Sequence, residues 1–408
     1  MFTAVSREPI AYAHPWDVPF EERIAALTAK SRRIAYFYGR PDTSTFRYRV
    51  FNMVEALEAA PDLDISASWF TWDDLWTAES FLDRADVLVL CRVSYEANVH
   101  RLITRARARG LPILFDIDDL IFDTDYTHLI VETLDQEMHE DKTWLHWFGL
   151  IGRVGATLRQ CDGAIVTNQI LAEKVRQFAP WIDARVVPNF LNRRQQRISC
   201  DIYNAKSNSG FARDGQVCAG YFSGTPTHNR DFAIVAQTLA RLLGEYPQLT
   251  LRVVGFLEPK GALLKHKSRI EVFPLQDFLN LQRLIGQVEI NIAPLQMNEF
   301  TNCKSELKYF EAAIAGTLTI ATPTFTFERA IRDGETALLA PAQGWEAKIR
   351  EAIGIVENTA RYREMAEAAY RHVEDTYSWH RFGDAIEAAV FGRGAGGVGD
   401  QQVAAAAQ

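Results

Sequence analysis

Short apolar runs alternate with amphipathic segments along most of the 408 residues. In the first half, the runs with the length and composition of buried strands are residues 34–38, 65–70, 87–91, 113–115, 164–167 and 185–187. In the second half they are residues 218–222, 249–254, 270–273, 288–293, 317–321 and 337–339. Between most of these runs, apolar residues recur at helical spacing. The alternation predicts an α/β protein with parallel sheets and helices on both faces.

A polar stretch rich in arginine and serine separates the two series after the break Val187-Pro-Asn-Phe. A chain of this length is also expected to form two domains. The predicted organisation is a first domain at 1–187, a connection at 188–216, a second domain at 217–375, a last helix at 376–390 and a low-complexity, disordered tail at 391–408.

The charge balance changes between the two halves. Lys and Arg number 44 against 52 Asp and Glu, a net charge of −8, which argues against a dedicated nucleic-acid binder. Up to Val187 the chain has 28 acidic and 20 basic residues, whereas the remainder has 24 of each. The second half is therefore better suited to an anionic ligand.

The five cysteines are scattered and show no paired metal-ligand spacing, which favours a reducing compartment. No run approaches 18 apolar residues, and the first ten residues lack a hydrophobic signal core. We therefore expect a cytoplasmic protein. The basic run 101–109 is either a solvated helix face or a contact with anionic lipid at the inner face of the membrane.

Residues 299–323 carry the clearest functional pattern. Apolar spacing predicts a helix over 305–315, ended by Gly316 and set between two strand-like runs. The loop before the helix follows a strand, and such loops bind ligands in parallel sheets. A helix start favours phosphate, and Lys304 adds a positive charge there, with Glu311 about two turns further in.

The run Phe-x-x-Cys-Lys-Ser-x-Leu-Lys-Tyr-x-Glu, residues 300–311, with the following Ala-Ala-x-Ala-Gly, resembles the donor-binding segment of family 4 GT-B glycosyltransferases. It is similar to a polysaccharide- and O-antigen-related branch. The usual pattern there is Glu-x7-Glu, and Glu311 matches the second Glu, which holds the ribose of a sugar nucleotide. Cys303 stands in place of the first Glu, a departure from the pattern. A simple solvated amphipathic helix remains the alternative.

The resemblance implies a GT-B fold, in which two Rossmann-like doubly wound domains face a cleft and the last helix crosses back to the first domain. Tyr377-Ser-Trp379 resembles the point where that helix turns. The donor-binding residues that the resemblance implies are Gly224, Thr225, His228, Arg230, Phe256, Pro274, Lys304, Ser305 and Glu311. For the turn around Arg230, an ordinary helix cap by Asn229 or Asp231 is the competing interpretation.

The acidic run 115–123 admits several interpretations. An Asp-x-Asp motif of GT-A transferases would chelate a metal ion. A haloacid-dehalogenase phosphatase would use Asp116 as nucleophile and Asp118 as acid, but Leu120 stands where that family expects Thr or Ser. The favoured interpretation places Asp118 where family 4 enzymes often carry a His near the transferred sugar. Simple capping of a turn or helix by the Asp side chains also stays open.

The loop after the first predicted strand resembles the acceptor-side loop of the family, with Gly39 and Arg47 as its candidate residues. Arg47 and Arg49 cannot share one helix face at their spacing, so only one is expected to point into the cleft. Arg47 is the one we predict.

The predicted activity is that of a glycosyltransferase, of the hexosyltransferase type in class EC 2.4. It would move a sugar from a nucleotide-sugar donor to a glycan or polyprenyl-linked acceptor, with retention implied by the resemblance. Asp118, Lys304 and Arg230 are the candidate catalytic residues, and no metal or other cofactor is expected. The alternatives are a Mg²⁺-dependent phosphatase using Asp116 and Asp118, or a non-catalytic sugar-nucleotide-binding subunit, which Cys303 motivates.

Overall fold

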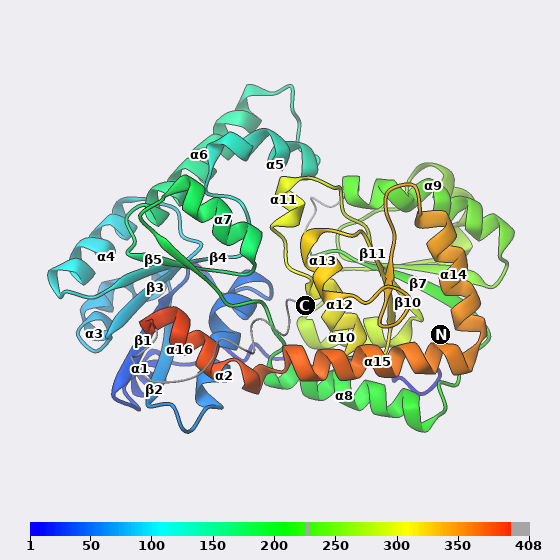
Figure 1. Cartoon of the computed structure of the whole chain (residues 1–408), viewed down its shortest axis with the longest axis horizontal. Coiled ribbons are helices and arrows are strands. Elements are labelled where there is room, and N and C mark those ends of the chain that lie inside the picture. Colours follow the sequence, from blue (N-terminus) through cyan, green and yellow to red (C-terminus); the bar gives the residue numbers. More distant parts are fainter. Residues whose placement is uncertain (225–228, 393–408) are drawn as a thin grey trace.

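The computed structural model describes residues 1–224 and 229–392, and its two parallel six-stranded sheets lie side by side in Figure 1. The first sheet has the order β2-β1-β3-β4-β5-β6 and the second the order β12-β11-β10-β7-β8-β9. The first consists of β1 (Arg32–Phe37), β2 (Ile65–Phe70), β3 (Val87–Cys91), β4 (Ile113–Ile117), β5 (Gly163–Val166) and β6 (Asp183–Val186). The second consists of β7 (Val217–Phe222), β8 (Leu249–Val254), β9 (Ile270–Phe273), β10 (Ile290–Ala293), β11 (Leu318–Ala321) and β12 (Leu338–Leu339).

The helices lie between the strands and pack on both sheets, as the alternation predicted (Figure 1). Those before the connection are α1 (Phe20–Leu27), η1 (Arg47–Phe51), α2 (Asn52–Glu58), η2 (Trp72–Thr77), α3 (Ala78–Leu82), α4 (Ala97–Ala108), η3 (Thr124–Tyr126), α5 (Thr127–Thr133), α6 (Asp141–Leu158) and α7 (Gln169–Phe178). Those after it are α9 (Asn229–Glu245), η4 (Gly261–Arg269), α10 (Phe278–Gln287), α11 (Glu299–Asn302), α12 (Leu307–Ala313), α13 (Phe325–Ala330), α14 (Trp345–Glu357), α15 (Thr359–Tyr377), η5 (Trp379–Arg381) and α16 (Gly383–Phe391).

Every predicted strand is present, with ends shifted by two residues or fewer. Most strands are buried along their whole length, which is why continuous apolar runs located them. The strand at 113–115 is longer than predicted and extends to Ile117. This extension places Asp116 inside the strand, in the centre of the first domain.

The helices differ more from the prediction. The helix predicted at 305–315 is the shorter α12, although Gly316 does have the left-handed conformation (φ +64°) that ends it. The polar connection is mostly a helix, α8 (Arg193–Asn208), whose first turn is capped by the Asn192 side chain. The predicted tail lies outside the described residues from 393 on.

The last helix crosses back to the first domain, as the resemblance implied (Figure 1). Phe382 stacks on Phe190 with ring centroids 4.1 Å apart, and Glu387 of α16 pairs with Arg32 of β1. At the other end of the chain, Phe2 packs into the core of the second domain. Within the described ranges, no helix is long and apolar enough to cross a membrane.

Candidate active site between the domains

The loops that follow three neighbouring strands of the first sheet bring polar side chains together. Thr45 follows β1, Arg92 follows β3 and Asp118 follows β4. The Thr45 hydroxyl donates to Asp118 Oδ2 at 2.9 Å, and Arg92 Nη1 donates to Asp118 Oδ1 at 3.0 Å. The strand order reverses between β1 and β3, and ligands bind at such points, outside the carboxyl ends of the strands.

Arg92 is held in an unusual backbone conformation. Its φ is +50°, in the left-handed region that residues with a side chain seldom occupy. Its guanidinium contacts Asp118 and also approaches Asp119 Oδ2 at 3.5 Å. Strain of this kind persists where the surrounding structure fixes it, and it is concentrated at functional sites.

The second domain contributes Lys304 to the same cluster. The Lys304 ammonium lies 3.2 Å from Asp119 Oδ1 and 4.4 Å from the centre of the Phe300 ring. Lys304 comes from the segment after β10, which borders the switch point of the second sheet. Arg92, Asp118, Asp119 and Lys304, here called the junction cluster, therefore join the carboxyl ends of both sheets. Burial raises the pKa of Asp118, while the charge of Arg92 opposes that rise.

Glu311 forms a second contact between the domains. Its Oε1 accepts hydrogen bonds from Tyr48 Oη at 2.5 Å, Gln195 Nε2 at 3.0 Å and Arg47 Nη2 at 3.2 Å. Arg47 reaches Glu311 of the second domain and is buried, while its acceptor-side role stays a prediction. Its Nη1 is also buried and has no hydrogen-bond partner in the described part of the chain. The proposed ribose ligand is therefore engaged by side chains of the first domain and of the connection.

Asp116 is fully buried in the first domain, where it pairs with Arg49. Both of its oxygens accept from Arg49, at 2.7 and 3.0 Å, and neither side chain is exposed. Arg49 also donates to the Val187 carbonyl and to Asn189. Burial raises the pKa of Asp116 to about 6, and the Arg49 charge opposes this. A carboxylate enclosed in this way cannot attack a phosphate, so the phosphatase alternative is wrong.

Arg230 lies at the start of α9 and faces the first domain. It contacts Asp135 at 3.0 Å and Glu132 at 3.4 Å, on and just after α5. In Figure 1 the α5 segment lies beside α11 of the second domain. Arg230 is thus at the domain boundary but engaged by carboxylates, and its role at a diphosphate stays a prediction. Thr225 and His228 lie outside the described residues.

The remaining predicted site residues are more peripheral. Gly224 follows β7 in open space, and Phe256 and Pro274 follow β8 and β9 with exposed side chains. The Ser305 hydroxyl is buried directly before α12. Packing explains the glycine at position 39, because a Cβ added there would lie only 2.8 Å from Trp72 Nε1.

The sequence interpretation missed several residues of the site. Thr45, Arg92, Tyr48 and Gln195 were not predicted. Arg92 had a usable signal, because it directly follows a strand next to the one that ends before Asp118. Tyr48 and Gln195 had none, since their role depends on how the two domains meet.

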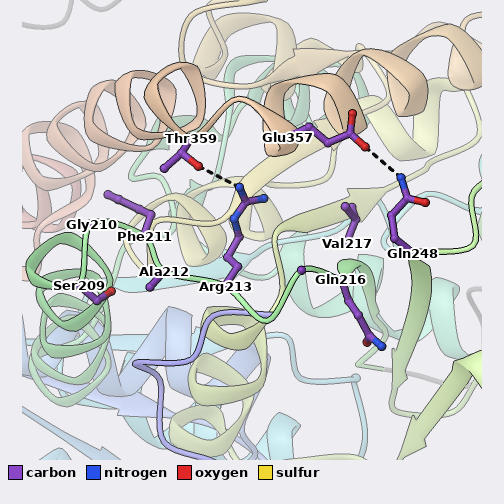
Figure 2. A pocket seen from close by; sticks show the side chains of 11 residues that line it. Ser209, Gly210, Phe211, Ala212, Arg213, Gln216, Val217, Gln248, Glu357 and Thr359 are labelled. Carbon is purple, nitrogen blue, oxygen red and sulfur yellow. Dashed lines mark hydrogen bonds between the residues drawn. The ribbon is translucent and has the colours of Figure 1, made fainter.

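A cavity of about 410 Å³ lies elsewhere, where the loop after α8 enters β7 at its amino end. Figure 2 shows Arg213 bonded to Thr359 and Gln248 bonded to Glu357 across this cavity. It is at the opposite edge of the sheet from the junction cluster. The candidate site is therefore defined by the strand ends and not by this cavity.

Several solved structures share this two-domain architecture. WaaG, a glycosyltransferase involved in lipopolysaccharide biosynthesis, superposes with a TM-score of 0.56 at 12% identity over 87% of this chain and 99% of its own. Sucrose-phosphate synthase from Thermosynechococcus elongatus gives 0.55 at 16% identity over 87% and 96%. HepE from Anabaena, in complex with UDP and glucose, gives 0.54 at 12% identity over 86% and 97%. The fold is GT-B.

The family comparison agrees with the fold. Residues 233–388 match the family described as glycosyl transferase-like. The match lies in the second domain and the helix that crosses back, and it agrees with the GT-B glycosyltransferase family that the resemblance implied. A search of curated protein sequences gives no significant match.

Proposed function

We propose that this protein transfers a sugar from a nucleotide-sugar donor to a glycan or lipid-linked glycan, with retention of configuration and without a metal ion. The observation that carries the proposal is the junction cluster, where Lys304 of the second domain meets Asp119, Arg92 and Asp118 of the first. It combines cations for a phosphate leaving group with carboxylates for sugar hydroxyls at one point between the domains.

Lys304 would stabilise the negative charge that grows on the nucleoside diphosphate as the glycosidic bond breaks. Its present partner, Asp119, would be exchanged in part for phosphate oxygens. Asp118 is fixed by Thr45 and Arg92, so its carboxylate is oriented before the sugar arrives. Closure of the domains around the donor would exclude water that otherwise hydrolyses it.

Cationic side chains support a metal-independent mechanism. Asp118 and Asp119 already face Arg92 and Lys304, so their charge is balanced by the protein itself. Lysine and arginine would then take the place that a divalent cation has in other phosphate sites.

Similarity of fold supports our proposal for the acceptor class. WaaG acts in lipopolysaccharide biosynthesis, and a TarM complex contains α-GlcNAc-glycerol and UDP. We therefore propose a glycan or polyprenyl-linked acceptor, reached at the inner face of the membrane. Arg101 on α4 would supply the peripheral contact with anionic lipid, whereas Arg105 and Arg109 are paired with Glu79 and Asp83.

The test is incubation of the purified protein with a panel of nucleotide sugars and lipid-linked acceptors, with and without EDTA. The proposal expects release of nucleoside diphosphate and a glycosylated product in both conditions. Binding of a sugar nucleotide with no turnover on any acceptor would favour the non-catalytic subunit. Loss of turnover in EDTA, restored by Mg²⁺ or Mn²⁺, would contradict the metal-independent mechanism.

A further inference from the structure

Lys308, in the first turn of α12, has a buried ammonium group without a hydrogen-bond partner in the described part of the chain. Its Nζ lies 5.0 Å from the centre of the aromatic ring of Tyr221. Tyr221 belongs to β7, the first strand of the second sheet. The ammonium therefore lies under the carboxyl end of β7, at the switch point beside β10.

The nearby carboxylates do not offset the effect of burial on the Lys308 ammonium. Asp231 of α9 and Glu311 favour the ammonium form, whereas Lys304 opposes it, and burial is the largest effect. Together they lower the pKa of Lys308 to about 8. Glu311 Oε1 already accepts from Tyr48, Gln195 and Arg47, so this carboxylate is shared among several donors.

Such an arrangement is unfavourable in the ligand-free protein. A buried charge without a hydrogen-bonded partner loses its hydration and gains little in return. Lys304 lies before α12 begins, and its positive charge adds to this because it repels Lys308. Arg47 Nη1 is a second buried donor without a partner in the described part of the chain, on a guanidinium that contacts Glu311. These donors are explained if an anion completes the site.

We propose that Lys308 is a binding residue for the diphosphate of the nucleotide donor, acting with Lys304. The inference rests on the proposed function and extends it to a residue that the sequence did not single out. An ammonium has three donors, so Lys308 can contact phosphate oxygens while keeping its place above the Tyr221 ring. A dianion between the two lysines would also relieve their mutual repulsion.

The experiment compares Lys308→Met, Lys308→Arg and the control Lys265→Met, which removes an exposed lysine of the same domain. Methionine keeps a straight apolar chain and removes only the charge. Thermal unfolding is measured without ligand, and the affinities of inorganic pyrophosphate and UDP are measured by calorimetry. Pyrophosphate has no base or ribose, so it reports on the phosphate contact alone.

The inference expects Lys308→Met to raise the ligand-free Tm by about 2–4 °C, because an uncompensated charge is removed. It also expects pyrophosphate and UDP affinities to fall by about 10- to 100-fold, with Lys308→Arg retaining most of the binding. Lys265→Met should change neither. A lower Tm with unchanged affinity would show that Lys308 is structural and overturn the inference.

The proposed function fails separately from this inference. If wild-type protein binds pyrophosphate through Lys308 but turns over no nucleotide sugar, the phosphate site stands and the transferase proposal falls. If the wild type transfers sugar and Lys308→Met binds donor and pyrophosphate normally, only the inference falls. Absence of pyrophosphate and UDP binding by the wild type also overturns the inference.

Discussion

Lys304 and Asp119 lie 3.2 Å apart across the boundary between the two domains, Nζ against Oδ1. Both residues are partly buried. Asp119 follows β4, one strand from the switch point of the first sheet, and Lys304 follows β10, which borders the switch point of the second. A lysine just before a short helix adds little to folding, because its charge meets the positive end of the helix dipole. Its place is better explained by an anion that both domains enclose.

Lys304→Ala should therefore reduce turnover far more than stability. Loss of a donor that stabilises charge in the transition state costs roughly 10²–10³ in rate by analogy with oxyanion-hole residues. The partly exposed pair with Asp119 contributes only about 0–1 kcal/mol to folding. The turnover rates and melting temperatures of the variant and the wild type test this prediction. An unaltered rate would show that the loop of Lys304 does not stabilise the leaving group.

Asp118→Asn should keep the fold and the nucleotide affinity while lowering turnover. The amide preserves the shape that Thr45 and Arg92 hold but removes the negative charge near the sugar. Asp116→Asn should instead destabilise the protein by about 3–5 kcal/mol, since it leaves Arg49 buried without its charged partner. Comparison of the two variants by calorimetry and kinetics separates these roles. A silent Asp118→Asn would contradict the role given to that carboxylate.

Tyr48→Phe should increase the affinity for nucleotide by a few-fold if Glu311 is the ribose ligand. The phenol and the ribose hydroxyls would compete for the same carboxylate, and removing one competitor frees it. Glu311→Ala should weaken binding and change the rate of the bound complex little, because the ribose alters little during reaction. Titration calorimetry with UDP tests both. Equal affinity in wild type and Glu311→Ala would rule out the ribose contact.

Raising the pH from 7 to 9.5 should stabilise wild type relative to Lys308→Met. The folded pKa of Lys308, about 8, lies below its unfolded value near 10.4. Between these values the unfolded chain holds a proton that the folded chain has released, so stability rises with pH. The groups facing Lys308 are Tyr221, Asp231, Lys304 and Glu311, and the pKa of Tyr221 is raised above this window by burial. Melting curves of wild type and Lys308→Met at the two pH values measure this effect. A difference in Tm between the two proteins that does not change with pH would contradict the prediction.

The strands were predictable, because buried strands in parallel sheets give continuous apolar runs of characteristic length. The GT-B architecture was implied by the resemblance of residues 300–311 to a known family. The roles of Asp116 and Asp118 were not, because they depend on where β4 ends. Its extension to Ile117 buries Asp116 against Arg49 and leaves Asp118 at the cleft. The contact of Tyr48 with Glu311 joins residues 263 positions apart, and no local pattern encodes it.

The most direct measurement is the rate of nucleoside diphosphate release from nucleotide sugars, with an acceptor and EDTA present, for wild type and Lys304→Ala. The account predicts turnover by the wild type in EDTA and a loss of about 10²–10³ in the variant, with both proteins equally folded. Equal rates for the two proteins, or turnover that requires an added divalent metal, would contradict it.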